Sequence, residues 1–180
     1  RDLHTLSDFD LIRERQGLGV DLPRFAGGSV LCELIMRLAP EHRDDRLFSA
    51  LVRGLDALVE AEPGRAGAVA LREIWRLVAV LGFAPELGRC AGCGRALEDG
   101  AGARFDHAAG GLRCTACGGQ GVRLDPEELR TLRRLATGDE LPGGDVSARQ
   151  RRLLTDFIRY HLAEGTRLRS LAFLERGDEG

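Results

Sequence analysis

The sequence reads Cys90-Ala91-Gly92-Cys93-Gly94 and then Cys114-Thr115-Ala116-Cys117-Gly118, with twenty residues between the two cysteine pairs. Two residues between paired cysteines allow a tight turn that directs both thiolates to one point. The glycine after each pair relieves crowding where the backbone turns its N–H groups toward the sulfurs. Cys90, Cys93, Cys114 and Cys117 together supply four sulfur ligands, the tetrahedral set that Zn²⁺ prefers in closed structural sites. The pattern predicts one structural zinc ion.

Paired cysteines have three other uses in proteins, and each is an alternative to structural zinc here. Two disulfides would suit a secreted protein, but the rest of the chain has enough apolar residues to form a core without them. A redox CxxC normally occurs once, at the start of a helix in a βαβ unit. An iron–sulfur cluster or a catalytic metal is a third alternative, although a catalytic zinc keeps one position open for water. His107, between the pairs, is expected in a loop, and Cys32 is expected as a small buried residue of a helix.

Apolar residues recur at helical spacing on both sides of the cysteine pairs. Helices are expected between Pro23 and Pro40, between Asp44 and Pro63, from Val69 to Leu81, between Asp125 and Gly138, between Ser147 and Gly165, and over the short stretch Leu168 to Leu174. The third has a wide apolar face, which is typical of the central helix of a bundle. Asp125 is expected to be an N-cap, and Ser147 is expected to form a capping box with Gln150. Weak alternation over residues 1–12 fits a strand or an extended linker.

The segment around the cysteines differs from its surroundings. Residues 89–123 are rich in glycine and poor in large apolar residues, so a metal is needed to hold them. Phe105 and Leu112 flank Gly110-Gly111, which predicts a short hairpin. The expected fold is mainly α, a helical bundle with an inserted small four-cysteine zinc-finger module. Residues 23–88 form the first part of the helical domain, residues 89–123 form the module, and residues 124–180 form the second part.

Composition gives broad bounds on compartment and chemistry. The chain is 43% hydrophobic and 30% charged, as soluble globular proteins are, and no apolar run is long enough to span a membrane. We therefore expect a cytoplasmic protein that does not bind membranes. The net charge of −2 argues neither for nor against nucleic acid.

The sequence contains no persuasive catalytic constellation. It lacks a glycine-rich phosphate loop with a lysine, a GxSxG elbow and an HExxH pattern. The acidic residues gather at helix starts, where helix capping explains them. We expect a protein that is not an enzyme.

Arginine is concentrated in the second helical part. Nine arginines and five acidic residues lie between Leu129 and Ser170, a local excess of four positive charges. Such a face can neutralise DNA phosphates. The candidate DNA-binding residues are Arg149, Arg151, Arg152, Arg159, Arg167 and Arg169. The alternative is an ordinary solvated helix surface in a chain whose basic residues are all arginine.

Several stretches resemble the bacterial DNA repair protein family RecO. They are Ala70-Leu71-Arg72-Glu73-Ile74-Trp75-Arg76-Leu77-Val78-Ala79-Val80-Leu81-Gly82-Phe83-Ala84-Pro85-Glu86-Leu87 running into the first cysteine pair, Phe105-Asp106, Gly110-Gly111-Leu112-Arg113-Cys114, Arg169-Ser170-Leu171-Ala172-Phe173-Leu174 and the opening Arg1-Asp2-Leu3-His4-Thr5-Leu6. The stretch from the third helix into the first cysteine pair is the specific part of the resemblance. The resemblance as a whole covers essentially the entire chain.

The resemblance implies a recombination mediator rather than an enzyme. Such proteins bind single- and double-stranded DNA, anneal complementary strands, and help to load recombinase together with RecR and the single-stranded DNA-binding protein. They act in the bacterial cytoplasm, at the nucleoid. Residues 1–22 resemble a linker and the end of the family's N-terminal oligonucleotide-binding barrel, which we expect to be missing from this sequence.

The resemblance also implies a partner contact. The family's helical domain is where the acidic, apolar tail of the single-stranded DNA-binding protein docks, and Arg72 matches a basic position suited to that tail. The alternative for Arg72 is an ordinary surface arginine. The alternative for the whole chain is a zinc-containing protein-interaction adaptor that does not bind DNA itself.

Overall fold

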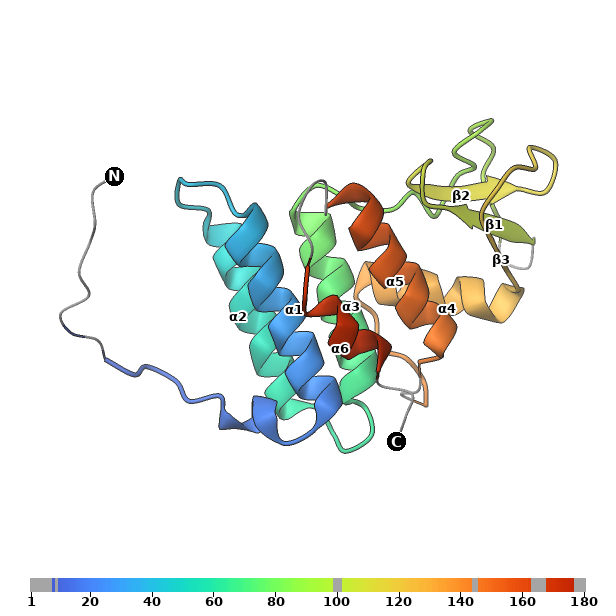
Figure 1. Ribbon diagram of the computed structural model, residues 1–180. Coiled ribbons are helices and arrows are strands. Elements are labelled where there is room, and N and C mark those ends of the chain that lie inside the picture. The colour runs from blue at the N-terminus through green and yellow to red at the C-terminus, as the bar shows by residue number, and fades with distance from the viewer. Residues whose placement is uncertain (1–7, 9, 99–101, 144–145, 163–167, 177–180) are drawn as a thin grey trace.

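The computed structural model describes residues 8, 10–98, 102–143, 146–162 and 168–176. These residues form six α-helices, one short 3-10 helix and a three-stranded sheet (Figure 1). The elements are η1 Gln16–Gly19, α1 Leu22–Leu38, α2 Asp45–Glu60, α3 Ala66–Val80, β1 Ala103–Asp106, β2 Gly111–Cys114, β3 Val122–Leu124, α4 Pro126–Thr137, α5 Ala148–His161 and α6 Leu171–Glu175. The mainly helical fold with a small inserted module is therefore confirmed.

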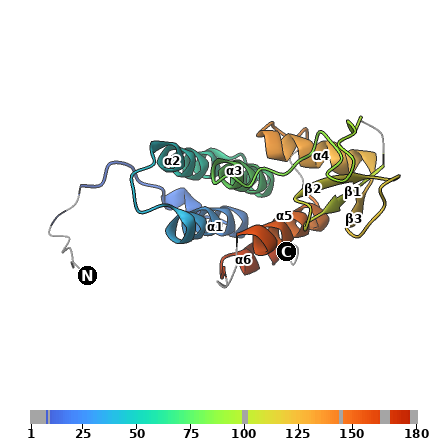
Figure 2. The same cartoon turned by 90° about the horizontal axis from the view of Figure 1, so that it is seen from above.

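Helix α3 is the centre of the bundle, as its wide apolar face predicted. It packs against α1 and α2 on one side and against α4 and α5 on the other (Figures 1 and 2). Leu71, Ile74, Trp75 and Val78 are fully buried. Burying a side chain of this size stabilises the fold by about 1.5–3 kcal/mol relative to leaving it exposed.

The helix ends follow their capping residues. Asp44 accepts hydrogen bonds from the first turn of α2, and Gly138 ends α4 in the left-handed conformation with φ 84°. Asp125 and Glu128 form a complete capping box at the start of α4. The capping box predicted at the start of α5 is only half formed, so the prediction was wrong for Gln150. The Ser147 side chain caps α5, but the Gln150 side chain does not bond back to Ser147. Its Nε2 atom donates to the Glu128 carbonyl at 2.8 Å.

The sheet lies at the end of the molecule opposite α1 and α2 (Figures 1 and 2). Its strand order is β2-β1-β3, and both pairings are antiparallel. Phe105 faces Leu112 across the β1–β2 hairpin, which confirms the predicted turn. Strand β3 was not predicted, because three residues next to a glycine-rich loop carry no readable alternation. Phe105, Leu112 and Leu124 join the same hydrophobic core as the helices.

The two ends of the chain depart partly from expectation. Residues 1–7 and 9 and Gly165 lie outside the described part, and residues 8 and 10–12 have no regular structure. The last helix begins at Leu171 rather than Leu168. Glu33 of α1 fixes that start, because its carboxylate accepts from the N–H groups of Arg169 and Ser170 at 3.1 and 2.8 Å.

No helix in the described residues is both long and apolar enough to cross a membrane. This agrees with the absence of a long apolar run in the sequence.

Candidate metal centre and basic surface

The four predicted ligands converge on one point. The Sγ atoms of Cys90, Cys93, Cys114 and Cys117 all lie within 4.8 Å of one another. The Sγ atoms of Cys93 and Cys114 are 3.9 Å apart. Zinc–sulfur bonds of about 2.3 Å in a tetrahedron place neighbouring sulfurs about 3.8 Å apart. This spacing fits one metal ion and is far longer than a disulfide bond of about 2.05 Å.

Each cysteine pair lies in a tight backbone turn. Gly94 and Gly118 have φ angles of +71° and +58°, which side chains with a Cβ rarely adopt, so glycine is required after both pairs. The first turn is closed by the N–H of Gly94, which donates to the Cys90 carbonyl at 2.8 Å. The Cys90 sulfur then accepts from the N–H of Cys114 at 3.3 Å, so the two turns are linked before any metal binds.

These contacts shift the pKa values of three of the thiols, and not all in the same direction. The backbone N–H groups of Cys114 and Cys93 stabilise the Cys90 thiolate and lower its pKa to about 6. The N–H of Cys117 likewise lowers the pKa of Cys114. Cys117 differs, because hydrogen bonding to Cys93 and its other sulfur neighbours raises its pKa to about 12. A further negative charge beside neighbouring thiolates is unfavourable, and a bound cation removes that penalty.

Two residues that the sequence did not single out fasten the module to the helices. Arg133 of α4 donates to the carbonyls of Leu87 and Leu97, at 3.0 and 2.7 Å, on both sides of the first cysteine pair. His161 at the end of α5 donates through Nε2 to the carbonyl of His107 at 2.7 Å. His107 lies in the turn between β1 and β2, as expected, and is not part of the sulfur cluster. No sequence pattern marked Arg133 or His161, because their partners are backbone carbonyls distant in the sequence.

Cys32 lies apart from the cluster, on α1. It is half-buried rather than fully buried, because it sits at the border of the helix's apolar face. Burial raises the pKa of its thiol.

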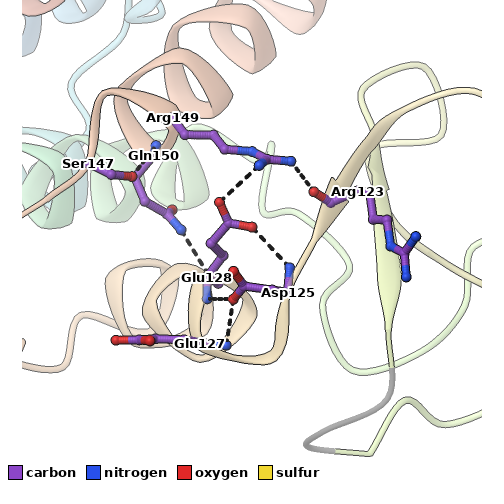
Figure 3. A network of polar contacts seen from close by, with 7 residues as sticks. All are labelled: Arg123, Asp125, Glu127, Glu128, Ser147, Arg149 and Gln150. Carbon is purple, nitrogen blue, oxygen red and sulfur yellow. Dashed lines mark hydrogen bonds and ion pairs between the residues drawn. The ribbon is translucent and has the colours of Figure 1, made fainter.

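The predicted DNA-binding arginines are not equivalent. Arg149 is tied into the network between α4, α5 and β3: it pairs with Glu128 at 3.2 Å and donates to the Arg123 carbonyl (Figure 3). Arg151 turns back to the Val146 carbonyl at 3.1 Å, and burial lowers the pKa of its guanidinium. Arg152 is exposed and lines a hollow of about 400 Å³ between β3 and α5.

The other three candidates lie nearer the C-terminus. Arg159 pairs with Asp156 at 3.2 Å and with Glu175 at 2.7 Å. Arg169 is exposed. Arg167 lies outside the described residues. Arg149, Arg152 and Arg159 therefore share the exposed side of α5, whereas Arg151 faces away from it.

Arg72, the candidate partner-binding residue, lies on α3 and is largely covered. Its side chain is 16% exposed, and its Nε donates to the buried carboxylate of Glu73 at 2.9 Å. It also lines a hollow of about 310 Å³ between α2, α3 and α4.

The fold and the cysteine cluster define a helical bundle that carries, at one end, a small four-cysteine module with the geometry of a metal site. The family model described as recombination protein O, C terminal, matches residues 19–172. The chain belongs to the RecO family of DNA repair proteins.

Individual relatives agree with this assignment. The DNA repair protein RecO of Nocardioides sp. is 33% identical over 184 residues, which cover 98% of this chain and 74% of the relative. The RecO protein of Symbiobacterium thermophilum is 35% identical over 77% of this chain and 56% of its own length. That of Desulfatibacillum aliphaticivorans is 32% identical over 96% of this chain and 70% of its own length. The matched segment thus spans between about half and three quarters of these relatives.

Proposed function

We propose that the chain acts in homologous recombination and DNA repair as a non-enzymatic mediator. It binds single- and double-stranded DNA, promotes annealing of complementary strands, and helps recombinase loading together with RecR and the single-stranded DNA-binding protein. The observation that carries this proposal is the match to the RecO family over nearly the whole chain. In the bacterial cell it works at the nucleoid. The direct test is annealing of two complementary oligonucleotides, which the protein should accelerate and which should stay at the spontaneous rate if the proposal is wrong.

The metal in this proposal is one structural Zn²⁺ per chain, held by the four cysteines. The sulfur spacing supports this choice, since it suits a closed tetrahedral shell that leaves no position for water. The metal would cross-link the two cysteine-pair turns and take no part in catalysis. Metal analysis of protein prepared without added iron should give about one zinc per chain. Iron at that stoichiometry would identify an iron–sulfur or iron-only site instead.

The proposed domain division follows the same logic. Residues 89–123 are an insertion between two parts of one helical domain, residues 23–88 and 124–180. The hydrogen bonds from Arg133 and His161 support a module that is clamped to the helices rather than hinged.

The proposed DNA surface is the exposed side of α5 with its flanks. Arg152 is its strongest member, because no described residue pairs with its side chain. Arg149 and Arg159 lie on either side of it along α5, and Arg169 is exposed just before α6. Arg151 and Arg167 belong to the same proposed set. The adaptor alternative is favoured by one observation: acidic residues already pair with Arg149 and Arg159. A salt titration of DNA binding separates the two functions.

The proposed partner contact is between Arg72 and the acidic, apolar C-terminal tail of the single-stranded DNA-binding protein. The Nη atoms of Arg72 are not engaged by Glu73, which leaves a pair of donors for a carboxylate. Fluorescence polarisation with the labelled tail peptide tests the contact, and unchanged binding by Arg72→Ala would remove the assignment.

A further inference from the structure

The outer face of the three-stranded sheet carries a row of three arginines. Arg104 lies at the centre of the row, on β1, because it is paired in register with Arg113 of β2 on one side and with Arg123 of β3 on the other. Residues directly opposite each other on adjacent strands share one face of the sheet and have Cβ atoms about 4.5–5.5 Å apart. The three guanidinium groups therefore extend from neighbouring points of one surface.

This face of the sheet points away from the core. Phe105, Leu112 and Leu124, which adjoin the arginines along the three strands, are buried in the core that the sheet shares with the helices. Because successive side chains of a strand point to opposite faces, the arginines point outward. Arg123 is exposed, and Figure 3 shows its side chain extending away from Arg149. A partner can therefore approach the row from solvent.

The row carries more positive charge than the face neutralises. Asp106 is an acid on the same face, and it pairs with Arg113 at 2.8 Å. Arg104 donates to a neutral group, the carbonyl of Gly121, at 3.2 Å. Within the described ranges, no acidic side chain pairs with Arg104 or Arg123. Like charges directly opposite each other destabilise a sheet, so the row has a cost that the fold alone does not explain.

The row continues the proposed DNA surface of α5. The hollow of about 400 Å³ at this edge of the sheet is lined by Val122 of β3 and by Arg149 and Arg152 of α5. Arg149 also donates to the backbone carbonyl of Arg123 (Figure 3). Strand β3 is an edge strand, and β1 lies in the middle of the sheet. A polyanion that lies on α5 would therefore meet Arg123 first and Arg104 next.

The composition of this face favours a phosphodiester backbone over a peptide. In the described strands, the outward positions hold arginine, aspartate and glycine, so they offer no apolar surface to the side chains of a peptide. They also hold no aromatic side chain on which a base could stack. The planar fork of arginine matches phosphate oxygens, and such contacts position a strand without reading its sequence.

We propose that Arg104 and Arg123, with Arg113 at the far side of the row, hold the phosphodiester backbone of a DNA strand on the outer face of the sheet. The inference rests on the proposed function, in which the chain binds DNA along α5. It adds a second contact surface and gives the four-cysteine module a direct part in binding, independent of base sequence.

The test is a salt titration by fluorescence polarisation with a labelled oligonucleotide, single-stranded and as a duplex. Arg104→Gln/Arg123→Gln should weaken binding to both about tenfold at low salt, the effect of losing two exposed charge contacts. Each phosphate contact contributes about 0.7 to the salt slope of a single strand and about 0.9 to that of a duplex. The slope should therefore become shallower by about 1.4 and about 1.8. The loss should be the same for oligonucleotides of different base composition.

Two further variants serve as comparisons. Arg123→Gln alone keeps the Arg104 contact with Gly121 and should give half of the change in slope. Arg43→Gln/Arg46→Gln removes two exposed arginines around the start of α2, at the opposite end of the molecule (Figure 1). This control should bind DNA as the unmodified protein does.

Thermal unfolding and zinc content separate a binding role from a structural one. Removing like charges that face each other should not weaken the sheet, so Arg104→Gln/Arg123→Gln should unfold no earlier than the parent and keep about one zinc ion per chain. If the arginines instead neutralise the thiolates of the four-cysteine cluster, the variant should lose zinc or unfold at a lower temperature. That result would overturn the inference.

The remaining outcomes are distinguishable from one another. An unchanged slope in Arg104→Gln/Arg123→Gln, with a shallower slope after alanine replacement of Arg149, Arg152 and Arg159, would overturn the sheet surface and leave the α5 surface. No DNA binding by the unmodified protein would overturn the proposed function and this inference with it. Weaker binding of a labelled peptide of aspartates and leucines, with unchanged DNA binding, would assign the row to a protein partner instead.

Discussion

At the scale of single residues, the sulfur cluster depends on hydrogen bonds as much as on cysteine spacing. The Cys90 sulfur accepts from the N–H of Gly92 at 3.4 Å and from that of Cys114 at 3.3 Å. These donors lower the thiol pKa and so favour the thiolate that binds metal. The protein contributes a preformed site in which some thiols are already inclined to ionise, and a bound metal ion would favour ionisation of the rest.

Cys114→Ser should lose the metal and destabilise the module, because three sulfurs and a hydroxyl do not satisfy a closed zinc shell. The zinc content should fall from about one ion per chain to far below it, with a lower thermal midpoint. Cys32→Ser is the matched control, since Cys32 lies outside the cluster and should leave the zinc content unchanged. Full zinc retention by Cys114→Ser would contradict the ligand assignment.

Glu33→Gln should destabilise the protein by about 1 kcal/mol at neutral pH, the usual effect of losing a helix cap. Burial alone would raise the pKa of Glu33, but hydrogen bonds from Ser170 and Arg169 outweigh it, and the net pKa is lowered from 4.5. A lowered carboxylate pKa stabilises the fold above the unfolded-state value, and this contribution disappears as pH falls through the folded-state value. Urea unfolding should therefore show a difference between variant and parent at pH 7 that shrinks below pH about 4.

The matched control for this experiment is Glu41→Gln, which removes an exposed carboxylate from the loop after α1. It should leave stability nearly unchanged at both pH values. A deficit of Glu33→Gln that persisted undiminished at low pH would show that packing, and not the charged cap, holds α6.

At the scale of elements, the turn after α4 requires glycine. Gly138→Ala should cost about 1 kcal/mol of unfolding free energy, because φ at this position is +84° and an added Cβ would lie 2.8 Å from Nε of Arg76. Gly19→Ala is the control, since no atom lies within 4 Å of its added Cβ and its φ is not positive. Equal urea midpoints for the two variants would contradict this reading of the turn.

Arg133→Gln should loosen the module from α4. It removes hydrogen bonds to the Leu87 and Leu97 carbonyls, and leaving such acceptors unpaired costs about 1–3 kcal/mol. Zinc should leave the variant faster when a chelator is added, as followed by a colorimetric zinc indicator. Arg130→Gln, on the exposed side of the same helix, should release zinc at the parental rate. An unchanged rate in Arg133→Gln would show that the clamp does not stabilise the metal site.

Sequence patterns predicted the elements whose signals are local. The spacing within each cysteine pair, the apolar period of α3 and the Asp125 cap all depend on residues close to each other in the sequence. Strand β3 was not predicted, and the second half of the α5 capping box was predicted wrongly, because both depend on residues distant in the sequence. Val122–Leu124 becomes a strand only beside β1. The Gln150 backbone N–H still donates to Ser147 Oγ, but its side-chain amide donates to the Glu128 carbonyl instead of bonding back to Ser147.

At the scale of the whole molecule, the two proposed surfaces lie on different parts of the fold. The proposed partner contact at Arg72 belongs to α3, whereas the proposed DNA surface belongs to α5 near the sheet (Figures 1 and 2). One molecule could therefore hold a partner's tail and a DNA strand together. The four-cysteine module lies next to the proposed DNA surface and is joined to it through Arg149, Glu128 and Arg123 (Figure 3).

We propose that this fold binds DNA through the arginines of α5, and a salt titration with a labelled single-stranded oligonucleotide tests this most directly. We predict binding at about 50 mM salt, with the logarithm of the affinity falling linearly as the logarithm of salt rises. Joint replacement of Arg149, Arg152 and Arg159 by alanine should make that slope shallower, while Arg43→Ala, on the distant α1–α2 loop, should not. Absence of binding at low salt, or an unchanged slope in the triple variant, would contradict the account.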